Sequence, residues 1–332
     1  MREHGPFLRL IVCESMHFSP NDFVHPDDKA ALEQLEAIPG FATAVKAFLG
    51  FFDEKLTHGI NMASKIRLGP NQLPKIHRYL PPICEKLGIE EPEFYLELNP
   101  QPNAYTFGDT QASITVTSGL LQSLDRDEFQ AVLAHECGHI VCRHVLYHTM
   151  ARMLMGGASY FGPLAALVSP IRYAMLYWSR RSEFSADRAA AVVLGDSKPV
   201  IETMIRLSGG PKTITAGVNI EQYIAQANDF DQLISTSTWD KILQSFAISE
   251  QGHPFPAVRA KEIQRWCQTG EFQRLRAAAL SDEQMPKASS INPSSGECLQ
   301  CKGTLVAEWK FCTTCGTQVA DRLTRIHETV VV

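Results

Sequence analysis

Residues 134–140 read Ala-His-Glu-Cys-Gly-His-Ile, and they contain an H-E-x-x-H pattern formed by His135, Glu136 and His139. Histidines four positions apart project from one face of an α-helix, so both imidazoles can bind a single zinc ion. The glutamate beside them then meets the water that the zinc activates. A pattern this short also arises by chance, so the case for a metal site depends on the residues around it.

The sequence around the motif predicts one long helix from Ser123 to about Met155. Asp125 is placed to cap its N-terminus, with Glu128 three residues later as the capping-box partner. Apolar residues recur at helical spacing until Gly156-Gly157 ends the pattern. The motif therefore falls in the middle of a helix, where its spacing suits a shared metal.

A carboxylate from a second helix is the best candidate for a further ligand, because catalytic zinc sites usually have three protein ligands and a water. A metzincin would need glycine at position 142 and histidine at position 145, where this chain has Cys142 and Val145. The segment 181–188 instead places Glu183 and Asp187 four residues apart on one face. Glu183 can bind zinc while Asp187 hydrogen-bonds a ligand histidine. The alternative is a solvated charged face, but the apolar run that follows favours packing against the core.

The two motifs H-E-C-G-H and E-F-S-A-D, in this order, resemble the gluzincin metallopeptidases of the HtpX and CAAX-prenyl-protease type. Residues 103–108, Asn-Ala-Tyr-Thr-Phe-Gly, are similar to the N-A-[FY] hairpin of that family. His253-Pro254 with Arg259 is similar to its H-P-x-x-x-x-R element. The similarity extends from about residue 70 to 265, and four motifs in order are far more specific than any one of them. It implies a mainly helical α+β zincin-type fold with a small antiparallel β-sheet.

The resemblance implies a zinc site with three protein ligands, which are His135, His139 and Glu183. It also implies that Glu136 is the general base, that Asp187 supports the ligands, and that His253 and Arg259 lie near the oxyanion. The residue types agree with peptide hydrolysis, because zinc lowers the pKa of its water to about 7 and a carboxylate can pass the proton to the leaving amine. A histidine followed by proline is also an ordinary turn or helix-start dipeptide, so this last element has a structural alternative.

Residues 114–117, Ile-Thr-Val-Thr, alternate as a strand with one buried face does. The resemblance implies that this is an edge strand, to which the substrate adds as an antiparallel strand. An interior strand of a small sheet fits the same residues.

Helical patterns precede the motif region at Pro26–Leu35, Phe41–Phe52 and Gln72–Leu87, and another follows it at residues 257–280. We divide the chain into an N-terminal extension and helical layer (1–69), a zincin metallopeptidase domain (70–283), a linker (284–297) and a C-terminal module (298–320). With 332 residues and 45% hydrophobic composition, the chain can bury a full core.

The C-terminal module contains two Cys-x-x-Cys pairs, a pattern that resembles a structural zinc ribbon. The first pair is Cys298 and Cys301, and the second is Cys312 and Cys315. A segment this small needs a metal to fold, so four unrelated thiols are a weak alternative. We therefore expect two zinc ions, one catalytic and one structural. The remaining cysteines are expected to be buried thiols: Cys13, Cys84, Cys137, Cys142 and Cys267.

Composition and charge limit where the protein is located and which partners it binds. A net charge of −5 gives no basic footprint for nucleic acid. The apolar stretch Leu8–Cys13 is short and interrupted by Arg9, which is unlike a signal peptide, and Met16 offers an alternative start. Nine cysteines then fit a reducing, cytoplasmic compartment.

The most apolar region, Met150–Trp178, is broken by Arg152, Arg172, two prolines and a Gly-Gly pair. We expect a helical lid, a dimer contact or a patch that lies on a membrane surface, with a plain core hairpin equally compatible. The protein is expected to need no detergent and to bind lipid only peripherally.

Two classes of function remain open on the sequence. The first is a zinc endopeptidase that acts on peptides or unfolded proteins, with a role in protein quality control implied by the resemblance. The second is a catalytically silent scaffold that binds proteins through the ribbon. Every expected catalytic residue type is present, which favours the enzyme.

Overall fold

A computed structural model of the 332-residue chain describes residues 18–156, 165–235, 253 and 255–284. The chain divides into two compact units, residues 1–280 and 281–332. Within the described part, no helix is both long enough and apolar enough to span a membrane.

The zinc ribbon expected at the C-terminus lies outside the described residues. Its four predicted ligands are Cys298, Cys301, Cys312 and Cys315, and the structural zinc assigned to them stays a prediction. Cys13 and nearly all of the linker 284–297 also lie outside the described residues.

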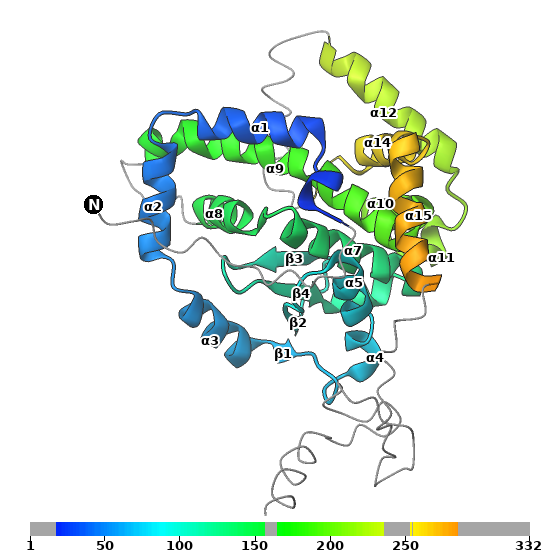
Figure 1. Ribbon diagram of the computed structural model, residues 1–332, viewed down its shortest axis with the longest axis horizontal. Coiled ribbons are helices and arrows are strands. Elements are labelled where there is room, and N and C mark those ends of the chain that lie inside the picture. Colours follow the sequence, from blue (N-terminus) through cyan, green and yellow to red (C-terminus); the bar gives the residue numbers. More distant parts are fainter. Residues whose placement is uncertain (1–17, 157–164, 236–252, 254, 285–332) are drawn as a thin grey trace, which may run out of the picture. The chain divides into compact units, whose positions relative to one another are not determined.

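The described residues form a mainly helical α+β fold, as predicted (Figure 1). The four strands are β1 (Ile66–Arg67), β2 (Glu93–Glu97), β3 (Ala104–Phe107) and β4 (Ser113–Thr117). The helices of the first half are α1 (Pro26–Glu36), α2 (Phe41–Phe51), α3 (Glu54–Ser64), α4 (Pro74–His77), α5 (Leu80–Leu87), α6 (Ser118–Ser123), α7 (Arg126–Val141) and α8 (Val145–Gly156), after a 3-10 turn at Pro20–Asp22. The later helices are α9 (Ala165–Leu194), α10 (Lys198–Gly209), α11 (Lys212–Thr215), α12 (Ile220–Ser235), α14 (Pro256–Cys267) and α15 (Gly270–Gln284).

The sheet is mixed, which corrects the expectation of an antiparallel sheet. Its strand order is β1-β2-β4-β3, with β2 and β4 parallel and the other two pairs antiparallel. The expected edge strand, β4, therefore lies in the interior of the described sheet, and its edges are β1 and β3. All five residues of β4 are buried. The threonines tolerate this because Lys65 Nζ donates to Thr115 Oγ1 at 3.2 Å and Thr117 Oγ1 donates to the Gln101 carbonyl at 2.8 Å.

The prediction of one long helix around the motif is wrong, because the chain forms two helices there, α7 and α8. The capping box of Asp125 and Glu128 at the start of α7 is confirmed. After α7, Arg143 adopts a left-handed conformation with φ of 62°, and the His144 amide donates to the His139 carbonyl at 2.9 Å. This turn directs the His144 ring back toward α7, which a continuous helix could not do.

The other helical predictions are confirmed for α1 and α2, within one residue of their bounds. The segment Gln72–Leu87 instead contains two short helices, α4 and α5, and residues 257–280 contain α14 and most of α15. Helix α3 was not predicted. Cys84 and Cys137 are buried as expected, whereas Cys142 and Cys267 are only partly buried.

Two apolar clusters stabilise the part of the fold that the structure describes. The larger surrounds α7 and takes in residues from the sheet, α5, α9, α10 and α14. The smaller joins the N-terminal layer to the hairpin of α8 and α9: Leu35 and Phe41 meet Met150, Met175 and Trp178 there. Met150 and Trp178 are therefore buried, whereas Tyr173 and Tyr177 on α9 are exposed, so the choice between a lid, a contact surface and a core hairpin stays a prediction.

Candidate metal centre

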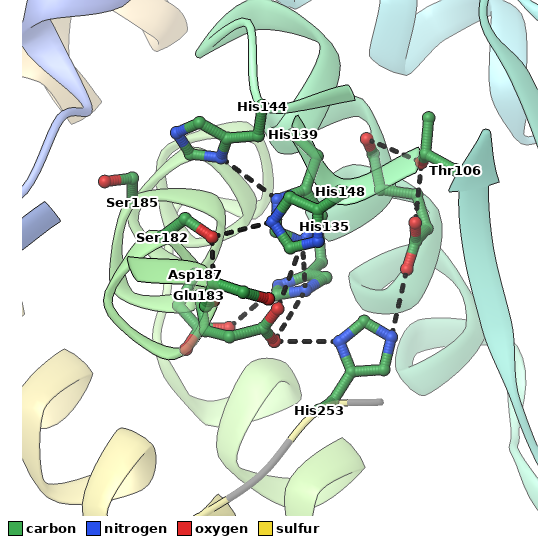
Figure 2. A network of polar contacts seen from close by, with 12 residues as sticks. Thr106, His135, His139, His144, His148, Ser182, Glu183, Ser185, Asp187 and His253 are labelled. Atoms are coloured by element: carbon green, nitrogen blue, oxygen red, sulfur yellow. Dashed lines mark hydrogen bonds and ion pairs between the residues drawn. The ribbon is translucent and has the colours of Figure 1, made fainter. Parts of the chain in front are cut away.

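The site forms where α7 crosses α9 at close range. Gly138 makes this approach possible, because a Cβ atom at this position would lie 2.9 Å from both the Cα and the carbonyl oxygen of Ala186 on α9. His135 and His139 project from α7, and Glu183 and Asp187 project from α9 (Figure 2). Glu136 also belongs to α7. All five side chains are buried.

Three of these side chains present their ligand atoms as a small triangle. The Nε2 atoms of His135 and His139 are 3.2 Å apart, and they lie 3.4 Å from Oε2 and from Oε1 of Glu183, respectively, so the triangle joins three side chains and both carboxylate oxygens. Tetrahedral zinc at the usual bond lengths of 2.0–2.1 Å holds its ligands about 3.3 Å apart. The Oε1 atom of Glu183 is buried and, within the described part of the chain, has no hydrogen-bond partner. These residues therefore fit a zinc ion.

A second layer of polar contacts holds the ligands from behind. Asp187 lies 2.9 Å from Nδ1 of His135, which leaves Nε2 facing the site. Arg259 donates two hydrogen bonds to Asp187, at 2.6 and 2.8 Å, and its Nη1 lies 2.9 Å from Glu183. The expectation placed Arg259 near the oxyanion. In the structure its guanidinium is buried against these two carboxylates, which favours a role in positioning them.

Glu136 stands beside the triangle with one oxygen fixed and one unbonded. Thr106 on β3 donates to its Oε2 at 2.6 Å. Its Oε1 is buried and has no hydrogen-bond partner among the described residues, and it lies 3.6 Å from Nε2 of His253. A carboxylate in this state can receive a proton from a group that enters the site.

His253 faces the same space from the other side (Figure 2). Its Nδ1 lies 2.8 Å from Glu183 and its Nε2 lies 3.1 Å from the Ala104 carbonyl on β3. The predicted residues of the catalytic site are thus brought together, with His253 beside Glu136 and Glu183, and Arg259 behind Asp187.

Electrostatics favour the metal-binding protonation state at Glu183 and His139, but oppose it at His135. Burial alone would raise the pKa of Glu183, but the positive charges of His253 and Arg259 hold it well below its usual range. Burial lowers the pKa of His139 to about 4, so this imidazole is neutral. Burial also acts to lower the pKa of His135, but hydrogen bonds to Asp187 and Glu183 raise it to about 9, so a metal ion has one proton to displace there.

Sequence reasoning missed several members of the network. Thr106 orients Glu136, His144 contacts His139, and the ring of His148 lies 4.6 Å from that of His139. The only sequence signal was the placement of two more histidines, five and nine residues after His139. These two histidines lie next to His139 only because the chain turns at Arg143.

A buried H-E-x-x-H helix packed on a carboxylate-bearing helix and flanked by a small sheet defines a zincin-type metallopeptidase. The family profile of peptidase family M48 matches residues 70–267. The chain belongs to peptidase family M48, whose members are zinc metallopeptidases.

Similar proteins carry the same activity in their names. The chain is 35% identical over 279 residues to the plastoglobule-localized metallopeptidase 48 of Arabidopsis thaliana, covering 81% of this chain and 80% of the relative. It is 27% identical over 257 residues to a protease HtpX homolog of Ralstonia pickettii, covering 70% of this chain and 87% of the relative. No solved structure matches it.

Proposed function

We propose that this protein is a zinc-dependent endopeptidase in which His135, His139 and Glu183 bind the ion and Glu136 is the general base. The observation that carries the proposal is the close approach of the three side chains, whose ligand atoms lie 3.2–3.4 Å apart, with the unbonded oxygen of Glu136 next to them. This arrangement serves hydrolysis by an activated water.

The proposed reaction uses the geometry around Glu136. A zinc ion bound here supplies Lewis acidity that polarises a peptide carbonyl and makes a water molecule more acidic. Glu136 Oε1 takes a proton from the attacking water and passes it to the nitrogen of the leaving amine. The hydrogen bond from Thr106 holds the other oxygen, so the carboxylate does not rotate between the two transfers.

His253 is the donor best placed to stabilise the negative oxygen of the tetrahedral intermediate. Burial would lower its pKa, but the charge of Glu183 and the hydrogen bond to it raise the pKa. Both interactions favour the protonated ring, whose Nδ1 lies 2.8 Å from Glu183. A positive donor in a site with little water gives large stabilisation of developing charge. Arg259 acts indirectly, by holding Asp187 and Glu183.

The edge strand β3 is the proposed platform for the substrate backbone. It pairs with β4 on one side, and its residues Ala104 and Thr106 contact His253 and Glu136. A peptide added along its other edge would pass beside the metal ligands. Backbone pairing tolerates many sequences, which supports unfolded proteins as substrates and a role in protein quality control.

A cavity of about 50 Å³ adjoins the same site. Its apolar lining comes from Leu120, Val132, Val200 and Met204, and its polar end includes Glu136. A water-sized group needs about 10–15 Å³ of such a cavity, so the cavity holds about four non-hydrogen atoms. We propose that it receives one aliphatic side chain next to the scissile bond.

A proteolysis assay on casein tests the proposal. The wild type should cleave casein, while Glu136→Gln keeps its zinc and loses at least about a hundredfold in turnover, because a general base supplies that factor or more. Glu33→Gln, an exposed glutamate on α1, is the matched control and should retain full activity. Retention of more than about a hundredth of the wild-type turnover by Glu136→Gln would refute the assignment. Absence of cleavage by the zinc-loaded wild type would favour the silent scaffold.

A further inference from the structure

Each histidine of the proposed zinc site has its own supporting chain of polar groups. His135 is held by Asp187 and Arg259, both within the region shared with the family. His139 is held by His144, whose other nitrogen contacts Asp28. We propose that Asp28, acting through His144, is a positioning residue for His139, so that helix α1 is part of the metal centre. This inference rests on the proposed role of His139 as a ligand.

The contacts in this second chain are short and buried. Nδ1 of His139 lies 3.1 Å from Nδ1 of His144 (Figure 2). Nε2 of His144 lies 3.0 Å from Oδ2 of Asp28. The relative exposures of His139, His144 and Asp28 are 3%, 3% and 2%. Water therefore has little access to these groups. When one side chain is removed, no water replaces the hydrogen bond that its neighbour has lost.

The hydrogen-bond directions agree along the whole chain. Nε2 of His139 faces the site, so Nδ1 must carry the proton and donate to Nδ1 of His144. His144 then carries its own proton on Nε2, which it donates to the Asp28 carboxylate. The Asp28 carboxylate thereby fixes the tautomer of His144. That tautomer of His144 in turn favours the tautomer of His139 whose Nε2 is free to bind metal.

Asp28 is itself rigidly held. Its Oδ1 accepts a hydrogen bond from Nε1 of Trp178 at 2.9 Å. Its Oδ2 accepts one from the Ser185 hydroxyl at 2.5 Å, and that hydroxyl in turn accepts from the His25 amide at 2.9 Å. The carboxylate thus ties the start of α1 to α9, the helix that carries Glu183. Residue 28 precedes the family match, which begins at residue 70.

The variant Asp28→Asn breaks this pattern without changing the size of the side chain. An amide nitrogen in place of Oδ2 would face the Nε2 proton of His144, and the flipped amide would face the Nε1 proton of Trp178. Either orientation sets two donors against each other. The His144 tautomer is then no longer fixed, and we expect the affinity for zinc to fall about 10-fold, the lower end of what outer ligand partners contribute.

Zinc affinity is measured on the full chain by competition with a chromophoric chelator at constant pH. The cysteines are unchanged in all variants and contribute the same background. Asp27→Asn, the exposed neighbour on α1, should keep the wild-type affinity. Leu35→Ala loosens the packing of α1 by removing a buried side chain and should lower stability while leaving zinc affinity within about twofold. An equal loss of affinity in Leu35→Ala would overturn the proposal.

A double-mutant cycle separates positioning from general support. His144→Phe removes the acceptor for His139 and should lower affinity about 10- to 100-fold. If Asp28 acts through His144, adding Asp28→Asn to this variant changes nothing further. Wild-type affinity in Asp28→Asn, or losses that multiply fully in the double variant, would refute the relay. Unchanged affinity in His139→Ala would instead refute the proposed function.

Discussion

Replacing Gly138 by alanine tests whether the close contact of α7 and α9 sets the geometry of the metal site. The added Cβ would lie 2.9 Å from two backbone atoms of Ala186 and 3.0 Å from the Cβ of Ala189. Ordinary contacts between non-bonded carbon atoms are about 3.5–4.0 Å, so the two helices must separate by roughly 0.5–1 Å. Glu183 and Asp187 move with α9, away from the histidines on α7.

We expect Gly138→Ala to lower kcat/KM on a peptide by about 10- to 100-fold, because displacements near 1 Å cost that much in catalysis. Stability should change less: overpacking costs about 1–3 kcal/mol, and the better helix propensity of alanine offsets up to about 1 kcal/mol. Peptide turnover, zinc affinity and urea unfolding are measured together. Gly59→Ala on α3, where an added Cβ meets nothing within 4 Å, is the control and should be slightly stabilising. Wild-type turnover and zinc affinity in Gly138→Ala would refute this reasoning.

Metal analysis and peptide kinetics test three further predictions. Glu183→Ala should strongly reduce zinc at the catalytic site, and Asp187→Asn should cost about 10- to 100-fold in affinity; full occupancy in Glu183→Ala would require a different third ligand. Met204→Ala enlarges the apolar cavity. In a peptide series, kcat/KM for a substrate with phenylalanine beside the scissile bond should then rise about 10-fold relative to kcat/KM for the leucine substrate. An unchanged ratio would place that substrate side chain elsewhere. The intact protein should bind two zinc ions and a chain ending at Gln284 one, with cleavage of small peptides retained; two ions in the shorter chain would contradict a separate ribbon.

The sequence predicts which side chains the structure brings together at the centre of the site, because their spacing is local. His135, Glu136 and His139 lie on one helical turn, and Glu183 and Asp187 lie on another, so the periodicity of a helix suffices to align each set. The pairing of the two sets came from the need for a third zinc ligand and from resemblance to a known family. The mainly helical α+β class was predicted in the same way and is confirmed.

The errors have a common physical origin in long-range contacts. Ile114 and Thr115 read equally well as an edge or an interior strand, because strand order depends on partners far away in sequence. The helix breaks at Arg143, where the sequence has no glycine or proline that would predict a break. Asp28 resembles any acidic residue in the first turn of a helix, and only the fold brings it beside His144.

The centre also has a consequence for how the enzyme is made. Its contacts join residues far apart along the chain: Trp178 and Asp28 are 150 positions apart, and His253 and Ala104 are 149 apart. Contacts at such separations close late in folding. A ribosome-bound chain that has exposed His135 still lacks Glu183 and His253, so we expect nascent and prematurely terminated chains to be proteolytically inert. The site is therefore expected to form only after the chain has been synthesised beyond residue 253.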